Sequence, residues 1–253
     1  MTSPASDAGG RGLLEGRTVL VTAAAGTGIG SATARRCLEE GARVAITDVH
    51  ERRLNESAAE LGVLGIVASV TSEDDVQRSI ARCVDEFGHL DILVNNAGLG
   101  GTAELTEMSD EQWEAVLDVT LTGTMRMTRA ALRHMYERGS GVVVNNASVV
   151  GWRAQAGQAH YAAAKAGVMA LTRCAAIEAA PHGVRVNAVA PSLAIHPHLA
   201  KVTTEELLAE LTTKEAFGRA AEPVEVANVI LFLASDLASY MTGEVIAVSS
   251  QHP

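Results

Sequence analysis

Short apolar runs alternate with longer helical segments along almost the whole chain, and this alternation constrains the fold more than any other feature. We expect strands at 17–22, 43–48, 64–68, 90–95, 141–147, 183–190 and 244–248. We expect helices at 28–40, 50–62, 72–87, 110–137, 158–180, 203–213 and 222–235. Strands that alternate with helices build right-handed βαβ units and a parallel sheet with helices on both faces. The sequence therefore predicts an α/β fold with a doubly wound, seven-stranded parallel sheet.

The chain is predicted to form one domain. Its 253 residues, 47% of them hydrophobic, are enough to bury one large core, and no repeat or low-complexity linker divides them. We expect a flexible tail at 1–16 and a single domain at 17–253, with a substrate lid at about 192–220. The N-terminus lacks the basic start and apolar core of a secretory signal, so we expect a cytoplasmic protein.

Composition argues against several classes of partner. A net charge of −10 disfavours nucleic acid and anionic membrane surfaces, and no apolar run is long enough to cross a bilayer. Cys37, Cys83 and Cys174 are far apart and form no Cys-x-x-Cys pair, so neither a disulfide framework nor a zinc site is indicated. We expect all three to be small core residues, and we expect no metal.

The first predicted strand runs into a glycine-rich turn that precedes an amphipathic helix. Gly26, Gly28 and Gly30 allow tight turning and close approach of a ligand, and the helix offers its first N–H groups to phosphate. Glycines here can also form a plain tight turn. The strand before them and the helix after them favour a site for a dinucleotide pyrophosphate.

The second predicted strand ends at Asp48, about twenty residues after the glycine-rich turn. A carboxylate at this position accepts both ribose hydroxyls of NAD and repels the extra phosphate of NADP. Arg52 and Arg53 follow closely, and an arginine is able to hold that phosphate. On balance NAD(H) is favoured over NADP(H).

Ser148, Tyr161 and Lys165 form the candidate catalytic group. Tyr161 and Lys165 stand four residues apart in an alanine-rich helical segment, so they share one helix face. A neighbouring cation favours the phenolate and is expected to lower the tyrosine pKa from its usual value of about 10. Ser148 follows a strand and is able to hydrogen-bond a substrate oxygen. The alternative, a chance pairing on a helix surface, is disfavoured by the nearby nucleotide signals.

Taken together, these features resemble the short-chain dehydrogenase/reductase family, from Arg17 to about Ser249. The resemblance also rests on Asn95-Asn96-Ala97-Gly98 and on the segment GRAAEPVEVANVILFLASDLASYMTGEVIAV. It implies a single-domain Rossmann fold and a homotetramer. It further implies that Tyr161 is the general acid/base, that Lys165 lowers its pKa and holds the nicotinamide ribose, and that Ser148 orients the substrate oxygen.

The resemblance implies a set of cofactor-binding residues at the carboxyl ends of the strands and in the catalytic helix. These are Gly28, Ile29, Gly30, Asp48, Ser69, Val70, Asn96, Ala97, Gly98, Tyr161, Lys165, Pro191 and Ala194. The chain departs from the family's Thr-Gly-x-x-x-Gly-x-Gly pattern in its glycine-rich turn. Three alanines follow Thr22, and the turn has one extra residue before Gly28 and Gly30. Ser69 stands where many relatives have an aspartate, and Thr120 replaces an asparagine that anchors a water in the proton relay.

The expected substrate pocket lies between the catalytic residues and the lid. Its expected walls are Trp152, Gln155, His160 and His196. The loop histidines have an alternative interpretation as exposed surface residues. Arg153 and Lys201 are candidates to meet the phosphates of coenzyme A, with solvated surface charge as the alternative.

The TAAAGTGIG turn, Thr120 and the ending VSSQHP resemble an actinobacterial subgroup. Its members act on a CoA thioester of a hydroxylated methyl-hexahydroindanone propionate in steroid C/D-ring breakdown. The expected function is therefore NAD(H)-dependent interconversion of a secondary alcohol and a ketone on a hydrophobic, cyclic, CoA-linked small molecule.

Two other functions remain open. A 3-oxoacyl-thioester reductase of fatty-acid type usually prefers NADP, so Asp48 counts against it. A non-catalytic nucleotide-binding sensor with the same fold typically lacks the tyrosine or the lysine, and this chain keeps both.

Overall fold

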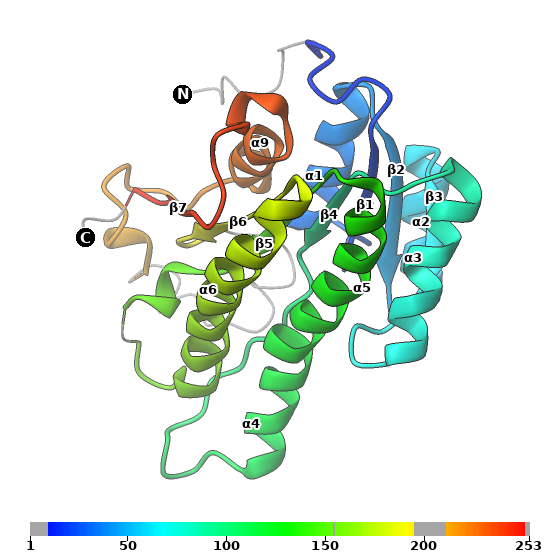
Figure 1. Ribbon diagram of the computed structural model, residues 1–253. Coiled ribbons are helices and arrows are strands. Elements are labelled where there is room, and N and C mark those ends of the chain that lie inside the picture. The colour runs from blue at the N-terminus through cyan, green and yellow to red at the C-terminus, as the bar shows by residue number, and fades with distance from the viewer. Residues whose placement is uncertain (1–9, 154, 195–210, 251–253) are drawn as a thin grey trace.

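A seven-stranded parallel sheet forms the centre of the computed structural model, which describes residues 10–153, 155–194 and 211–250 (Figure 1). The strand order is β3-β2-β1-β4-β5-β6-β7. The strands are β1 (Thr18–Val21), β2 (Arg43–Asp48), β3 (Leu64–Val67), β4 (Ile92–Asn95), β5 (Gly141–Asn146), β6 (Val184–Pro191) and β7 (Val245–Val248). The predicted fold class and strand count are confirmed.

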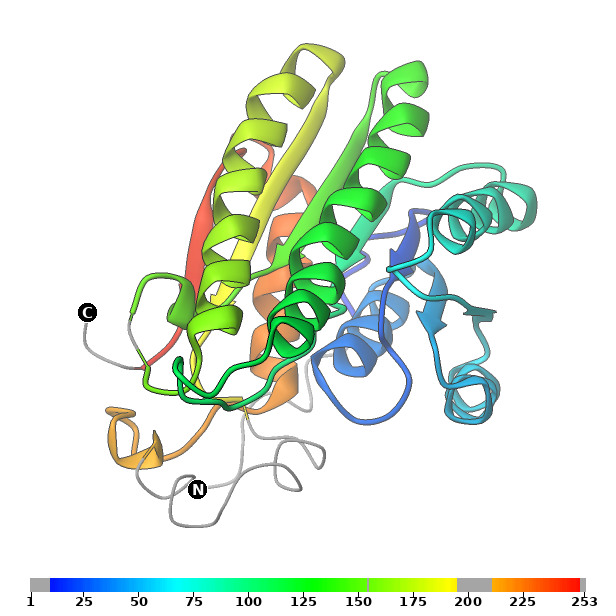
Figure 2. The same ribbon diagram turned by 90° about the horizontal axis from the view of Figure 1, so that it is seen from below.

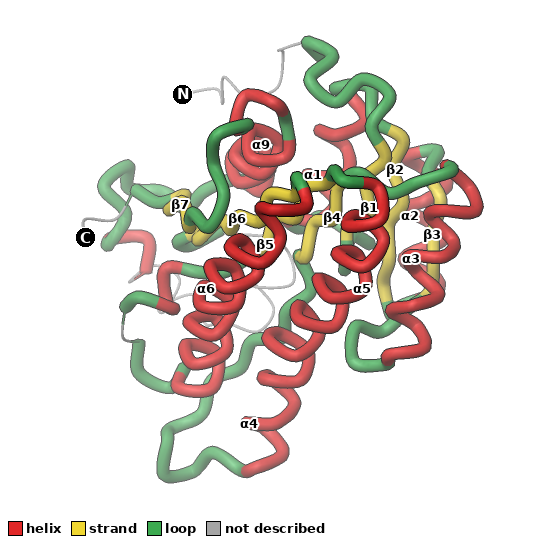
Figure 3. Tube along the Cα trace, viewed as in Figure 1, coloured by secondary structure: helices red, strands yellow, loops and turns green. Residues whose placement is uncertain are grey.

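Helices cover both faces of the sheet (Figure 3). One layer contains α1 (Ile29–Glu39), α2 (Glu51–Leu61) and α9 (Pro223–Ala234). The other contains α3 (Glu73–Phe87), α5 (Gly123–Arg138) and α6 (Ala159–Ala179), and α5 is preceded by α4 (Asp110–Leu117). Helices α5 and α6 run side by side, roughly along the direction of the strands that they cover (Figure 2). Short 3₁₀ helices lie at Val149–Gly151, Ala180–His182 and Asp236–Ala238.

Each central strand contributes to two cores because successive side chains of a strand point to opposite faces. In β1, Val19 and Val21 pack under α1 and α9, whereas Leu20 packs under α3 and α5. All three are fully buried. This explains why the strands are continuous apolar runs rather than alternating ones. Among the described residues, no helix has the length and apolar character needed to cross a bilayer.

Three sequence expectations need correction. The segment 110–137 is not one regular α-helix, because a π-helical segment, Asp118–Thr122, lies between α4 and α5. Cys37 and Cys83 are buried as expected, but Cys174 is exposed on α6, whose apolar residues are spread round the helix. The N-terminal tail was predicted to reach residue 16, yet Leu14 is 1% exposed and belongs to the core. Most of the predicted helix 203–213 lies outside the described residues.

The turn between β1 and α1 is held in a strained conformation. Ala23 has a φ of 51°, the only positive φ of a non-glycine residue in the described part of the chain. The side-chain nitrogen of Asn96 donates to the carbonyl oxygens of Thr22 and Ala23, at 3.1 and 3.0 Å. A Cβ on Gly30 would lie 2.7 Å from the Ala23 oxygen, so Gly30 must be glycine for the turn to pack against α1.

The extra residue of this turn is accommodated by contacts with β2 and α2. The Ala25 N–H donates to the Asp48 carboxylate at 3.3 Å, and the Gly26 N–H donates to the Ser57 hydroxyl at 3.1 Å. The longer turn therefore extends toward α2, and its backbone lies against the end of β2.

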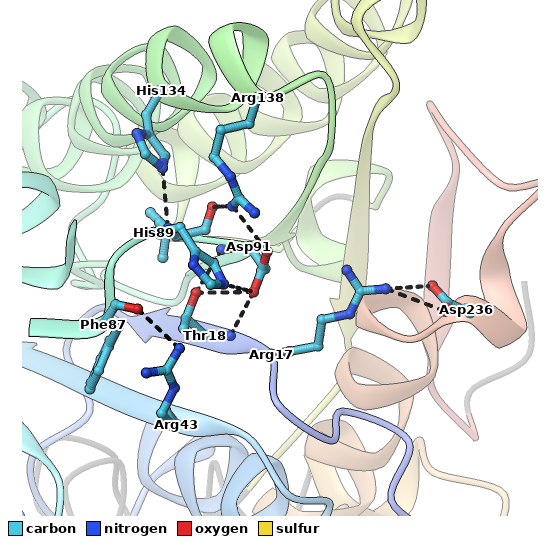
Figure 4. Close-up of polar contacts among 10 residues, drawn as sticks. Arg17, Thr18, Arg43, Phe87, His89, Asp91, His134, Arg138 and Asp236 are labelled. Carbon is cyan, nitrogen blue, oxygen red and sulfur yellow. Dashed lines mark hydrogen bonds and ion pairs between the residues drawn. The ribbon is translucent and has the colours of Figure 1, made fainter.

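A buried carboxylate, that of Asp91, lies at the amino ends of the central strands β1 and β4, at the other end of these strands from the glycine-rich turn (Figure 4). Asp91 accepts hydrogen bonds from the N–H and hydroxyl of Thr18 and from the Arg138 guanidinium, and His89 lies 3.1 Å from it. Burial opposes ionisation of Asp91, but the hydrogen bonds outweigh it and the pKa of the carboxyl is lowered. His134 accepts the N–H of Leu90 beside this group.

Replacing Asp91 by Asn should destabilise the fold by about 3 kcal/mol, since an amide nitrogen would face donors that now meet a carboxylate. Urea denaturation at neutral pH measures this change. Asp236→Asn is the matched control, because Asp236 pairs with Arg17 at the exposed surface and its side chain is 86% exposed. We expect that change to stay within about 0.5 kcal/mol. Equal effects of the two substitutions would contradict the assigned role of Asp91.

Replacing Ala23 by Gly should raise the free energy of unfolding by about 0.5 to 1 kcal/mol. The gain arises because relief of left-handed strain exceeds the backbone entropy that glycine loses on folding. Ala25→Gly is the control, since Ala25 does not have a positive φ, and it should lower stability by a similar amount. Thermal unfolding of the two variants tests the difference. Loss of stability in both would show that Ala23 is not strained.

Candidate active site

The polar residues of interest gather where the parallel strands end. The carboxyl ends of β1, β4, β5 and β6 lie along one edge of the sheet. The chain builds the sheet outward from β1 to β3 and then returns to place β4 on the other side of β1. Ligands of open α/β sheets bind in the crevice between two strands at which the order changes in this way. This edge is therefore the candidate active site.

The structure brings Ser148, Tyr161 and Lys165 together. The Ser148 side chain lies beside the Tyr161 phenol and influences its pKa, and the Lys165 nitrogen lies 5.5 Å from the centre of the phenol ring. Ser148 follows β5, and the other two residues lie in the first two turns of α6. Lys165 is only 3% exposed, and its ammonium donates to the carbonyl oxygen of Asn146.

Burial dominates the electrostatics of this group. It raises the pKa of Tyr161, although the nearby Ser148 side chain acts in the opposite direction. Burial also lowers the pKa of Lys165 to about 8. We expected a lowered tyrosine pKa, and the net direction is upward because burial is the largest effect. The phenol is therefore protonated at neutral pH and is poised to donate a proton.

Thr120 anchors the loop that follows β4. Its hydroxyl accepts the N–H of Leu99 at 3.0 Å and donates to the carbonyl of the same residue at 3.2 Å. A Cβ on Gly98 would lie 3.5 Å from the Lys165 nitrogen and 3.8 Å from the Thr120 hydroxyl oxygen. Because a hydroxyl has a single proton, that of Thr120 is already engaged. Thr120 thus positions the loop beside Lys165, and its part in a proton relay stays a prediction.

The start of α1 fits the pyrophosphate of a dinucleotide. Gly28 is the N-cap residue and makes no side-chain cap, and the first turn carries no acidic residue. The first N–H groups of the helix are therefore available to an anion. A Cβ on Gly28 would meet nothing within 4 Å, so this glycine leaves open space for a ligand to approach. Ile29 packs against the core beneath.

Asp48 lies at the end of β2 as predicted and is 7% exposed. One carboxylate oxygen accepts the N–H of His50 at 2.9 Å, and the other accepts that of Ala25. The Arg53 guanidinium is 3.7 Å away. The carboxylate is therefore held in place at the position where the ribose of a dinucleotide would meet it.

Ser69 and Val70 follow β3 at the same edge. The Ser69 hydroxyl lies 2.7 Å from that of Thr71, and its N–H donates to Asp75. Val70 packs against Gly123, where a Cβ would approach it within 2.5 Å. Both residues are thus fixed by α3 and α5.

The loops after β4 and β6 complete the candidate cofactor site. The N–H of Ala97 donates to the Thr22 hydroxyl at 3.0 Å. The Pro191 carbonyl accepts a long hydrogen bond, 3.5 Å, from Ser148. Ala194 is paired with Ala221 as a parallel bridge. The predicted cofactor residues at or after the carboxyl ends of β1, β2, β3, β4 and β6 therefore lie along one side of the sheet.

The segment after β6 is held by a buried carboxylate that sequence reasoning missed. Glu215 is 4% exposed, accepts the N–H of Leu193 at 3.3 Å, and accepts the hydroxyl of Ser250 at 2.7 Å. It ties the loop beside Pro191 to the C-terminal segment. Spacing gives no signal for such a contact, because the three residues come from distant parts of the chain.

The predicted substrate residues differ in their surroundings. Trp152 is 51% exposed and Gln155 is half-buried. His160 is 2% exposed, and its ring lies under the loop at Gly101, where a Cβ would be 3.1 Å from the imidazole nitrogen. His160 therefore supports this loop rather than presenting an open wall. His196 and Lys201 lie outside the described residues, and Arg153 makes a polar interaction within the chain.

Asn146 is the other residue that sequence reasoning did not assign. Its carbonyl accepts the Lys165 ammonium, and its side-chain nitrogen donates to the Asn96 oxygen at 3.1 Å. The signal was the pair Asn145-Asn146 at a strand end, where adjacent side chains must point to opposite faces.

Comparison with known proteins agrees with this geometry. Residues 23–250 match the family model described as enoyl-(acyl carrier protein) reductase. A Mycobacterium tuberculosis protein is 62% identical over 251 residues, or 96% of each chain. It is named (5R,7aS)-5-hydroxy-7a-methyl-1-oxo-2,3,5,6,7,7a-hexahydro-1H-indene-carboxyl-CoA reductase, which bears out the resemblance to that subgroup.

A 3-oxoacyl-[acyl-carrier-protein] reductase from Thermotoga maritima is 40% identical over 93% of this chain and 97% of its own. The crystal structure of a short chain dehydrogenase from Mycobacterium smegmatis superposes with a TM-score of 0.87 at 57% identity, covering 97% of both chains. The chain belongs to the short-chain dehydrogenase/reductase family, oxidoreductases that act on a hydroxyl or ketone group with a nicotinamide cofactor.

Proposed function

We propose that this protein is an NAD(H)-dependent reductase of a hydrophobic cyclic ketone carried as a CoA thioester. The contact of Ser148 with a protonated Tyr161, beside the buried Lys165, carries the proposal, because it supplies a proton donor for a carbonyl oxygen. The substrate class is supported by the name of the Mycobacterium tuberculosis relative, which describes a CoA-linked bicyclic hydroxy-ketone.

The proposed reaction uses the three side chains in distinct roles. The Ser148 hydroxyl orients the substrate ketone beside the Tyr161 phenol. The reduced nicotinamide cofactor, when bound, would supply the hydride that the carbonyl carbon accepts, and would itself be oxidised. Tyr161 donates its proton to the carbonyl oxygen, which yields the alcohol and a phenolate. The Lys165 ammonium, 5.5 Å from the phenol ring, stabilises the negative charge that forms.

The preference for NAD(H) rests on Asp48. Its carboxylate is fixed by two backbone N–H groups at the end of β2 and would repel a phosphate on the adenosine ribose. Arg53 is close enough to offset part of that repulsion. We expect NADH to bind more tightly than NADPH.

The second candidate is reduction of 3-oxoacyl thioesters, which the Thermotoga maritima relative supports at 40% identity. Its class usually takes NADP(H), so Asp48 favours the first candidate. A non-catalytic nucleotide sensor is disfavoured by the intact contact between Ser148 and Tyr161.

We also propose a cytoplasmic homotetramer in which α4, α5 and α6 pair across a two-fold axis. Large apolar side chains are exposed on α4, α6 and α9. They are Trp113, Ile177 and Phe232, at 36%, 78% and 36% exposure. Sizing chromatography with light scattering should give a mass near four times the 26.3 kDa of one chain. A monomer peak would exclude this assembly.

Replacing Tyr161 by Phe should lower kcat by at least about a hundredfold while NADH binding persists, because only the proton donor is removed. NADH and NADPH binding are measured by fluorescence titration. Turnover is measured with cyclic keto-acyl-CoA thioesters and with their free acids.

Each arm of this experiment separates two hypotheses. Turnover of the thioesters but not of the free acids supports the proposed substrate class. Undiminished turnover in Tyr161→Phe removes the proposed acid. Tighter NADPH binding overturns the role of Asp48, and NADH binding with no turnover of any ketone would favour the sensor.

A further inference from the structure

Asn146, the last residue of β5, has one polar atom that the fold leaves without a partner. Its carbonyl oxygen and its side-chain nitrogen are used by Lys165 and Asn96. Its side-chain oxygen Oδ1 is buried and has no hydrogen-bond donor among the described residues. Buried polar groups in folded proteins nearly always have partners, so this oxygen requires an explanation.

Neighbouring hydrogen bonds fix the direction of the Asn146 amide. Asn96 uses its nitrogen to donate to the carbonyl oxygens of Thr22 and Ala23. The side-chain oxygen of Asn96 therefore faces Asn146, and Asn146 must donate to it through its N–H₂ group. Turning the Asn146 amide over would set two oxygens against each other. The unpartnered atom is thus an oxygen, which needs a hydrogen donor.

The side-chain oxygen of Asn95 is also buried without a partner, but its surroundings differ from those of the Asn146 oxygen. Asn95 is 2% exposed, and its amide lies in the core between Thr128 and Asn145. Asn146 is only partly buried and lies beside Lys165, two residues before Ser148. Its oxygen is therefore part of the candidate active site.

The position of β5 in the sheet selects one half of the dinucleotide. Three strand spacings separate β2, which carries Asp48, from β5, because β1 and β4 lie between them. At about 4.8 Å for each spacing this is roughly 14 Å. With the adenosine ribose at Asp48 and the pyrophosphate at α1, the part that extends to β5 is the nicotinamide half.

We propose that Asn146 is a further cofactor-binding residue, whose amide oxygen accepts a hydrogen bond from a hydroxyl or amide N–H of the nicotinamide half. This inference rests on the dinucleotide site proposed above. The same residue then joins the two ends of that site. Its carbonyl oxygen accepts a hydrogen bond from the Lys165 ammonium. Its side-chain nitrogen donates to Asn96, whose own nitrogen holds the glycine-rich turn through the carbonyls of Thr22 and Ala23.

The test compares three ligands by calorimetry, namely NADH, ADP-ribose and ADP. ADP-ribose lacks the carboxamide, and ADP lacks the second ribose as well. Asn146→Leu keeps a similar volume and removes the acceptor, so we expect the Kd for NADH to rise three- to tenfold with that for ADP unchanged. A parallel rise for ADP-ribose assigns the donor to the ribose hydroxyls, and no rise assigns it to the carboxamide.

Thr172→Val is the matched control. It removes a buried partner of the neighbouring Asn145 on the other face of β5, and it should leave all three affinities unchanged. An equal loss for NADH and ADP in Asn146→Leu would show action through Asn96 and the turn, and would overturn the inference. No loss for any ligand would also overturn it.

The outcome also separates this inference from the proposed function. If the unchanged protein does not bind NADH, the proposed function fails. If it binds NADH and Asn146→Leu binds equally well, only the inference fails. Circular dichroism checks the fold of each variant, and Asn146→Ala takes the place of Asn146→Leu if the latter does not fold.

Discussion

The parallel arrangement of seven strands between two helical layers is the constraint on which the rest of the structure depends. Both faces of the sheet are buried, so the strands are apolar and their interiors leave no place for reactive groups. Polar side chains appear where the strands end, and a parallel sheet brings all its carboxyl ends to one edge. The glycine-rich turn, Asp48, Asn96 and Ser148 are neighbours for this reason.

The candidate active site holds charged and polar groups whose burial is unfavourable. Lys165 is almost fully buried, and its pKa falls to about 8 because the charged form loses hydration. Tyr161 is held in its protonated form by the same effect. The strained Ala23 and the unpartnered oxygen of Asn146 belong to the same region. Such departures from the local rules of stability are expected of a functional site.

Two asparagines connect parts of this region that are distant in the chain. Asn96 holds the strained turn after β1, and Asn146 joins Asn96 to the carbonyl that receives Lys165. At the other end of the central strands, Asp91 fixes the starts of β1 and β4 through Thr18 and Arg138. Buried polar groups thus clamp both ends of the central strands, while apolar packing fills the layer between.

The sequence by itself determined the order of strands and helices, because apolar runs and helical periodicity are local properties. It also placed Tyr161 and Lys165 on one helix face, and it identified glycines at the turn where Gly30 later proved to have no room for a side chain. Asp48 at a strand end was predictable for the same reason, since strand limits can be read from local pattern.

Only the tertiary structure decided features that depend on contacts between distant segments. The π-helical segment at Asp118–Thr122 accompanies the bonds of Thr120 to Leu99, which no periodicity encodes. Cys174 lies on the exposed face of α6. The sequence does not identify that face, because the apolar residues of α6 are spread round the helix. The pKa of Tyr161 depends on how deeply the site is buried, and the free oxygen of Asn146 depends on what Asn96 does with its own amide. Burial and hydrogen-bond satisfaction are properties of the assembled fold, and sequence spacing alone does not contain them.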